Sequence, residues 1–170
     1  MGLRQNYSFS VTKNIPAGAG LGGGSSNAAL TFRILNKLEE SGLSDDELIE
    51  FSRTLGADIP FFIKGTTGIG TGLGQDIEPL DIQPEAWIVV VNPGINSSTP
   101  EAYALCEPNP EPDFAIKGVL LEEEIDQWQY LLHNNVEPTV IARHELVGNI
   151  KDQLYEFGAS YASMSGSGSS

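Results

Sequence analysis

A glycine-rich run near the start of the chain contains the residues that could most directly do chemistry. Five of the seven residues from Gly18 to Gly24 are glycine, and helix-forming residues follow from Ala28 to Leu38. Glycine adopts positive φ angles without strain and lets a ligand approach the backbone closely. A loop that opens a helix also presents free amides and the positive end of the helix dipole. The pattern therefore predicts an anion site at Gly18–Ser26, with phosphate as the usual anion.

The same run allows other interpretations. Gly18, Gly20 and Gly23 match the spacing of a dinucleotide-binding fingerprint, which is a weak signal by itself. Glu39 and Glu40 lie near the place of a ribose-binding acid, but they end a predicted helix rather than a second strand. A Walker A loop is excluded because no lysine follows the last glycine. A loop with a purely structural role would hardly need so many glycines, since each one costs conformational entropy on folding.

Asp58 is the second residue that could do chemistry. It follows Gly56-Ala57 and precedes the apolar run Ile59-Pro60-Phe61-Phe62-Ile63. Because Pro60 disfavours a helical conformation at Ile59, we expect Asp58 in an extended turn before a very apolar strand. Its type and position leave two roles open. Asp58 could hold the turn, as most loop aspartates do, or it could be a catalytic carboxylate.

Strands and helices in mixed order are expected to position these residues. Alternating side chains over residues 7–13 predict a half-buried strand. A helix is predicted over residues 25–38, with an apolar stripe of leucines and isoleucine at positions 30, 34, 35 and 38. Ser44 and Glu47 have the spacing of a capping box, which predicts a second helix over residues 45–55. A second glycine cluster, at positions 65, 68, 70, 72 and 74, indicates hairpin strands.

The second half of the chain predicts more helices and two short strands. The apolar run 87–91 is typical of a strand that is central in a sheet. Thr99 followed by Pro100 predicts a helix start, and further helices are expected at about 114–121, 123–133, 139–142 and 144–157. Residues 161–164 predict a short strand before the glycine- and serine-rich end. A change of composition near Pro79–Pro84 places a domain boundary there, so the fold class is α+β with domains 1–82 and 83–170.

Composition excludes several function classes. The 170 residues carry 9 basic and 23 acidic side chains, a formal net charge of −14, which argues against a nucleic-acid partner. With few cations, phosphate would be held mainly by backbone amides and a divalent cation. We expect no membrane partner, because no apolar run reaches membrane-spanning length, and the single cysteine fits a cytoplasmic location. His133 and His144 lack ligand partners at metal-site spacing and are predicted to be surface residues.

Three motifs in order resemble those of the GHMP small-molecule kinases. Residues 16–29, Pro-Ala-Gly-Ala-Gly-Leu-Gly-Gly-Gly-Ser-Ser-Asn-Ala-Ala, are similar to the ATP-phosphate motif of that superfamily. Residues 55–62, Leu-Gly-Ala-Asp-Ile-Pro-Phe-Phe, resemble the segment with its catalytic aspartate, and Ser165–Gly168 resembles its third motif. The resemblance runs over nearly all of the chain. Its fuller form points to a member of the non-mevalonate isoprenoid pathway, whose small-molecule substrate is a cytidine diphosphate-linked methylerythritol.

The resemblance implies a fold, cofactors and site residues. The fold would be an N-terminal domain like domain 2 of ribosomal protein S5, followed by a ferredoxin-like domain, and the cofactors would be ATP and Mg²⁺. Asp58 would be the base that takes the proton from the substrate hydroxyl, and Ser25 or Ser26 would lie near the metal. Gly166, Ser167 and Gly168 would lie near the active-site mouth. The phosphate loop would comprise Pro16, Gly18, Gly20, Leu21, Gly22, Gly23, Gly24, Ser25 and Ser26.

The chain also departs from the family pattern. The family's first segment, with its catalytic lysine and substrate-binding residues, has no counterpart here, and Lys13 does not match that lysine's motif. The strands and helix that follow the third motif in the family have no counterpart either. We therefore expect an internal fragment, truncated at both ends, with an open sheet edge and an exposed core. We expect it to be poorly active or inactive alone, a prediction that robust substrate-dependent ATP turnover by the purified chain would refute.

Two other functions remain open. The chain could be another GHMP kinase, of the homoserine or mevalonate-pathway type. It could instead be a catalytically inactive nucleotide-binding fragment that keeps the loop without the chemistry.

Overall fold

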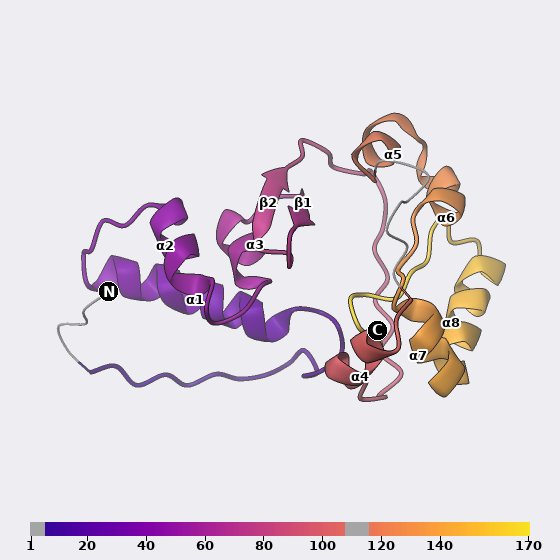
Figure 1. The fold of residues 1–170 in the computed structure, drawn as a ribbon, viewed down its shortest axis with the longest axis horizontal. Helices are drawn as coiled ribbons and strands as arrows, with labels where there is room; N and C mark the ends of the chain where they lie inside the picture. The colour runs from indigo at the N-terminus through magenta and orange to yellow at the C-terminus, as the bar shows by residue number, and fades with distance from the viewer. Residues whose placement is uncertain (1–5, 108–115) are drawn as a thin grey trace. The chain divides into compact units, whose positions relative to one another are not determined.

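The computed structural model describes residues 6–107 and 116–170. The chain forms two compact units. Unit 1 comprises Met1–Ala17 and Gly22–Asp81, and unit 2 comprises Gly18–Leu21 and Ile82–Ser170. The glycine-rich run therefore passes from unit 1 into unit 2 at Gly18 and returns at Gly22. Figure 1 labels the elements of both units.

Unit 1 is built on three helices and one hairpin. The helices are α1 (Gly23–Leu38), α2 (Asp45–Ser52) and α3 (Ile59–Lys64). The strands β1 (Gly68–Thr71) and β2 (Asp76–Pro79) pair antiparallel, with Gly68 opposite Pro79 and Thr71 opposite Asp76. The hairpin predicted from the second glycine cluster is confirmed.

The core of unit 1 lies where α3 packs against α1 and α2. It contains aliphatic side chains from all three helices, with Ile63 at 0% and Leu48 at 1% exposure. Helix α1 contributes Ala28, Ala29 and Phe32 to this core. The apolar stripe predicted for this helix is wrong, because Leu30 and Leu38 are each 57% exposed. Small alanines on the buried face let α3 approach α1 closely.

Local signals at helix ends are confirmed in α2. The Ser44 side chain accepts a hydrogen bond from the backbone N–H of Glu47, and the Glu47 carboxylate accepts one from the N–H of Ser44 at 2.8 Å. This reciprocal pair satisfies two amide groups that the helix itself leaves unpaired. The helix ends at Ser52, earlier than the predicted Leu55.

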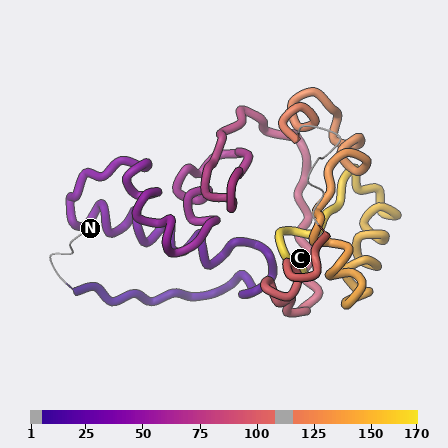
Figure 2. The backbone as a smooth tube through the Cα atoms, in the orientation of Figure 1, coloured from indigo at the N-terminus to yellow at the C-terminus, as the bar shows by residue number. Residues whose placement is uncertain are grey.

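The strand predicted at residues 7–13 is wrong. Residues 6–14 form neither helix nor strand, and Figure 2 shows this stretch as an extended tube. Phe9 and Val11 are 52% and 58% exposed. Strand geometry depends on a hydrogen-bonded neighbour, and the described residues offer none to this stretch.

Unit 2 is helical in the residues that the structure describes. Its elements are α4 (Thr99–Ala104), α5 (Ile116–Glu122), the 3₁₀ turn η1 (Ile125–Gln127), α6 (Trp128–Leu131), α7 (Glu137–Arg143) and α8 (Glu145–Glu156). The start predicted at Thr99 is confirmed. The single helix predicted over 123–133 is wrong, since η1 and α6 share that segment. The start predicted at residue 114 lies outside the described residues.

The strands predicted at 87–91 and 161–164 are also wrong. Neither segment is assigned as a strand, and Trp87 and Ile88 are 99% and 89% exposed. The sheet of a ferredoxin-like domain is therefore not formed in residues 82–107 and 116–170. An apolar run has strand propensity, but a strand requires a partner for its backbone groups.

A second core holds unit 2 together. It joins the first residues of α7 to α4, α8 and the segment before the chain end, through Ala102, Val136, Val140, Val147 and Met164. Helices α7 and α8 pack side by side (Figure 1). Among the described helices, none is both long and apolar enough to cross a membrane.

Candidate functional site

The amino terminus of α1 forms the part of the glycine-rich run that belongs to unit 1. Gly22 is the N-cap residue, in the left-handed region with φ 61° and ψ 15°. A Cβ atom on Gly22 would lie 2.6 Å from the Phe62 ring, so only glycine fits there. The N–H of Ser26 donates to the Gly22 carbonyl at 2.9 Å, which closes the first turn of the helix. The helix start is thus fixed against α3 by this close contact.

The first amides of α1 have room for a ligand. A Cβ atom on Gly24 would meet nothing within 4 Å. The first turn of α1 contains no acidic side chain, so nothing of negative charge on the helix itself offsets its positive end. The first N–H groups of any helix lack intrahelical partners. An anion can therefore reach the backbone at Gly23–Ser25.

Lys13 is a residue that the sequence interpretation missed at this place. Its Nζ atom lies 3.6 Å from the position that a Cβ on Gly23 would occupy. A lysine beside the positive end of a helix is unfavourable unless an anion lies between them. The sequence could have indicated Lys13 as an anion-binding residue, because it is the only cationic side chain between residue 6, where the described chain begins, and the glycines.

Asp58 lies at the N-cap of α3, in unit 1. The extended turn and apolar strand predicted around it are wrong: Asp58 has φ −83° and ψ −12°, and residues 59–64 are helical. Proline is tolerated in the first helical turn, where its missing N–H has no intrahelical acceptor, so Pro60 does not stop this helix. A short apolar run also cannot distinguish strand from helix.

The Asp58 carboxylate is exposed and does not hold the turn. It makes no capping hydrogen bond to α3. Within the described part of the chain it also has no other hydrogen-bond or ion-pair partner. Its Oδ1 atom lies 4.0 Å from where a Cβ on Gly74 would be, so the hairpin turn passes beside it. The carboxylate is therefore free to accept a proton from a bound molecule.

In unit 2 the remaining glycine-rich segment packs against the predicted third motif. Gly20 has φ +76°, and a Cβ there would lie 2.1 Å from the carbonyl oxygen of Ser165. The Ser165 hydroxyl donates to the Gly20 carbonyl at 2.8 Å, and the N–H of Ser170 donates to the Ala19 carbonyl at 3.2 Å. Two segments far apart in the sequence are thus joined by one side chain–backbone and one backbone–backbone hydrogen bond.

The other predicted site residues lie in both units. Pro16 is exposed on the segment that enters the loop, in unit 1, and Ser25 and Ser26 are half-buried in the first turn of α1. Gly166 and Gly168 have positive φ angles of 56° and 90°. In unit 2, the Ser167 hydroxyl lies 2.7 Å from the Thr99 hydroxyl.

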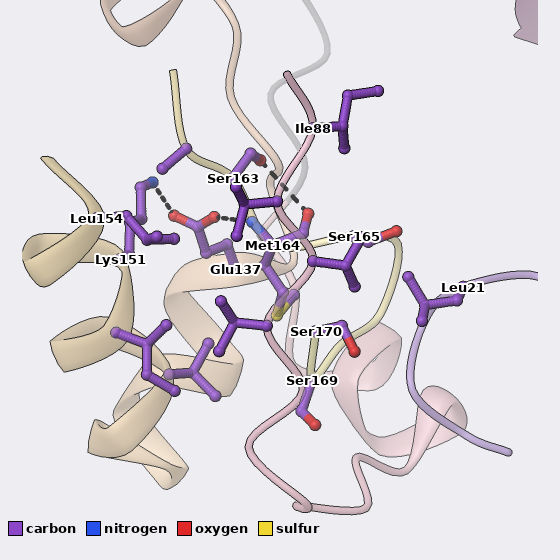
Figure 3. Close-up of a pocket in the computed structure, with 16 residues that line it drawn as sticks. Leu21, Ile88, Glu137, Lys151, Leu154, Ser163, Met164, Ser165, Ser169 and Ser170 are labelled. Atoms are coloured by element: carbon purple, nitrogen blue, oxygen red, sulfur yellow. Dashed lines mark hydrogen bonds and ion pairs between the residues drawn. The ribbon is translucent and has the colours of Figure 1, made fainter. Parts of the chain in front are cut away.

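A cavity of about 320 Å³ in unit 2 is a different kind of site (Figure 3). Its walls are mostly apolar side chains of α8 and of residues 88–91, with Leu21 and the serines at 165, 169 and 170. The Glu137–Lys151 ion pair is its only charged feature among the described residues. Such a lining does not suit a polyphosphate.

The part of the chain that the structure describes contains no cluster of three or more metal-ligating His, Cys, Asp or Glu side chains. A divalent cation would therefore find at most one or two such side chains together, and water and the oxygens of a bound ligand would supply most of its ligands. Mg²⁺ commonly keeps several waters and binds substrate phosphates in this way.

Comparison with known proteins extends this picture. Residues 1–66 match the family model of the GHMP kinases N terminal domain. A 4-diphosphocytidyl-2-C-methyl-D-erythritol kinase of Bacteroides thetaiotaomicron is 41% identical over 159 residues, which are 93% of this chain and 57% of the relative. The enzyme of the same name from Parabacteroides distasonis is 42% identical over 94% of this chain and 59% of its own length.

A solved structure is also similar. It is a crystal structure of 4-(cytidine 5'-diphospho)-2C-methyl-D-erythritol kinase, with a TM-score of 0.73 and 31% identity over 92% of this chain and 57% of that one. The chain thus spans 57–59% of the length of these relatives. The resemblance to the GHMP kinases drawn from the three motifs is confirmed by the family model over residues 1–66 and by relatives of about 40% identity over most of this chain.

Proposed function

We propose that the protein to which this chain belongs is an ATP-dependent small-molecule kinase. It transfers the γ-phosphoryl group of ATP to a hydroxyl of 4-diphosphocytidyl-2-C-methyl-D-erythritol, a step of the non-mevalonate isoprenoid pathway. The observation that carries the proposal is the amino terminus of α1, where the backbone at Gly24 faces open space and the Lys13 ammonium lies beside the neighbouring Gly23. The identity of about 40% to kinases of this name supports the choice of substrate.

The phosphates of ATP fit the α1 amino terminus by charge and by space. The amides of Gly23 to Ser25 would donate hydrogen bonds to phosphate oxygens, and Lys13 would add a charge that compensates theirs. Gly18–Leu21, which precede this helix in the sequence, belong to the same predicted phosphate loop. Mg²⁺, when bound, neutralises charge on the phosphates, and the hydroxyl of Ser25 or Ser26 is the protein ligand we assign to it.

Asp58 is the base in this proposal. An exposed carboxylate without a described partner can accept the proton of the attacking hydroxyl at an Oδ atom. Helix α3 holds it firmly, because Ile59 and Ile63 on the same helix are buried in the core of unit 1. Proton removal and positioning by this chain's residues are what phosphoryl transfer requires from a protein.

The remaining parts follow from the same assignment. Residues 1–82 would form the ATP-binding domain and 83–170 the second domain of the kinase. Gly166, Ser167 and Gly168 would border the active site. The protein would act in the cytoplasm on a small molecule, without a nucleic-acid partner, as its net charge of −14 suggests.

A chimera tests the function directly. This chain would replace the matching segment of the Bacteroides thetaiotaomicron relative, and ADP release would be measured with the cytidine diphosphate-linked substrate. We expect turnover, and we expect Asp58→Asn to lower kcat by orders of magnitude with ATP affinity almost unchanged. Asp81→Asn, which changes an exposed aspartate outside the motifs, is the matched control.

The outcomes separate the alternatives. Turnover with homoserine or a mevalonate-pathway substrate instead would assign the chain to another kinase of the family. ATP binding without turnover of any substrate would identify an inactive nucleotide-binding module. Full activity of Asp58→Asn would remove Asp58 from the mechanism.

A further inference from the structure

The loop Ser165–Ser170 has to be held in place without a sheet. Residues 161–164 before it form no strand, and the chain returns on itself through Gly166 and Gly168. Within the loop, the N–H of Gly168 donates to the Ser165 carbonyl at 3.0 Å, and the N–H of Ser165 donates to the Ser170 carbonyl at 2.8 Å. These bonds shape the loop, but they do not fix it to the rest of unit 2.

Two side chains at the start of α7 fix the loop. Asn134 donates from its amide nitrogen to the carbonyls of Met164 at 2.9 Å and Gly166 at 2.7 Å. Its Oδ1 atom accepts the N–H of Val136 at 2.9 Å. The opposite orientation of the amide would place oxygen against two carbonyls, so the network allows one orientation only. Asn134 thus joins the loop to the first turn of α7.

Glu137 completes the attachment from one turn further on. Its Oε2 atom accepts the N–H of Met164 at 2.7 Å, and its Oε1 atom pairs with the ammonium of Lys151 on α8 (Figure 3). Glu137 is only 7% exposed. A buried carboxylate requires such partners, and breaking them is costly. Both backbone polar groups of Met164 are therefore bonded to α7-side residues, in the way that a strand would be bonded to a neighbour.

The attachment extends to the glycine-rich run. The hydrogen bonds from Ser165 to Gly20 and from Ser170 to Ala19 lie directly beyond the residues that Asn134 and Glu137 hold. The contact at Gly20 is so close that a shift of Ser165 must move the Gly20 backbone as well. Further bonds join Ser167, Ser169 and Ser170 to residues 92–99. Asn134 and Glu137 bond the backbone of Met164, directly before Ser165. The position of Ala19–Gly20 thus depends in part on two side chains more than a hundred residues away in the sequence.

We propose that Asn134 and Glu137 are positioning residues of the phosphate loop: through Ser165–Ser170 they hold Ala19 and Gly20 in the conformation that binds the nucleotide. This inference rests on the proposed kinase function. Neither residue touches the nucleotide in this scheme. Both act on the loop through its backbone.

Asn134→Asp is the test, with Asn135→Asp as matched control. The aspartate keeps the acceptor for Val136 but loses both donors to the loop. Asn135 is the exposed neighbour, so its substitution adds the same charge without touching the loop. ATP binding by the 170-residue chain is measured by calorimetry, and exchange of the Gly168 and Ser170 amides by hydrogen-exchange NMR, with the α8 amides as reference for folding.

We expect Asn134→Asp to weaken ATP binding about tenfold, a change of 1.4 kcal/mol, and to speed exchange at Gly168 and Ser170 while α8 stays protected. Asn135→Asp should change neither. Unchanged affinity and exchange in Asn134→Asp, or equal losses in both variants, would overturn the proposal. A second variant, Ser165→Ala, removes the bond to Gly20 without altering α7 and should also weaken binding.

If Asn134→Asp does not fold, Ser165→Ala still tests the proposal. Unchanged ATP affinity in Ser165→Ala is sufficient by itself to contradict the proposal. Absence of ATP binding in the unsubstituted chain would overturn the nucleotide part of this inference, whereas failure of the proposed function would appear as absence of turnover in the chimera. Faster amide exchange at Gly168 and Ser170 in Asn134→Asp would, even without ATP binding, show that Asn134 positions the loop. This result distinguishes failure of the proposed function from failure of the positioning role.

Discussion

Gly24→Ala should affect the stability of α1 and ATP binding at its amino terminus in opposite directions. Gly24 lies in the first turn of α1, and an added Cβ would meet no atom of the protein within 4 Å. Alanine favours the helix over glycine by about 0.5–1 kcal/mol, partly because it restricts the unfolded chain. Without a ligand, the substitution should therefore raise the free energy of unfolding of unit 1 by about this amount.

The same methyl group should weaken ATP binding. In the proposed function a phosphate lies against the open backbone at Gly24, so an added methyl group would keep its oxygens away from the amides of the first turn. A hydrogen bond to a charged group contributes about 1.5–3 kcal/mol, so its loss corresponds to an affinity lower by about 10- to 150-fold. A variant that is more stable yet binds more weakly is not what a general defect in folding would produce.

Denaturant unfolding and calorimetric ATP titration of the 170-residue chain measure the two effects. Gly118→Ala is the control, because Gly118 lies in α5, outside the predicted motifs, and also has open space beside it. We expect this control to gain stability and to leave ATP affinity unchanged. Unaltered ATP affinity in Gly24→Ala would refute the assignment of phosphate to the start of α1.

Further predictions concern residues around both glycine loops. Gly20→Ala should lower the free energy of unfolding of unit 2 by more than the roughly 1–2 kcal/mol of left-handed strain, because its Cβ would collide with Ser165. Gly94→Ala is the control, since Gly94 has a similar φ angle but open space beside it. Equal losses of stability in denaturant unfolding of the two variants would contradict the close contact. Lys13→Met should weaken ATP binding about fivefold and reduce the salt dependence of this binding, since an exposed charge contributes about 1 kcal/mol. Lys37→Met, at the far end of α1, should leave both quantities unchanged. Calorimetric ATP titrations of the two variants at two salt concentrations measure the difference. Hydrogen bonds from the backbone and side chain of Ser44 lower the pKa of Glu47. A carboxyl whose pKa is lower in the folded state stabilises the fold above its unfolded pKa of about 4.3, and this stability is lost as the pH falls through the folded value. Unfolding of Glu47→Gln should thus depend less on pH between about 5 and 3 than that of the parent chain, and identical pH profiles would contradict the capping box.

Helices could be predicted from the sequence where a local signal specified them. Ser44 and Glu47 lie three residues apart, and their bonds form within one turn, so no distant partner was needed. The same holds for Thr99 before Pro100 and for the glycine hairpin around Gly72. Each of these elements takes its conformation from residues a few positions away.

Strands and side-chain burial could not be predicted in the same way. Residues 7–13 and 87–91 have strand composition, but a strand exists only where another segment pairs with it, and the described residues supply no such segment. Burial of α1 likewise depends on which face α3 approaches, and Phe62 and Ile63 approach the alanine face. Asp58 was predicted as a site residue from its motif, although the sequence did not reveal that residues 59–64 form a helix there.

The glycines of the first loop are needed for different reasons, and only some of them can line a phosphate site. Gly20 is required by the backbone of Ser165, and Gly22 by the ring of Phe62. Gly18 is confined by the side chain of Asn96, whose Oδ1 would lie 2.6 Å from a Cβ there. Packing within each unit therefore accounts for these three glycines without a ligand. Gly24 has no such neighbour, and it is the glycine whose backbone faces open space at the positive end of a 16-residue helix. Among the glycines of this loop, Gly24 is therefore the one whose role we assign to the bound phosphate, because it combines this open space with the helix amino terminus.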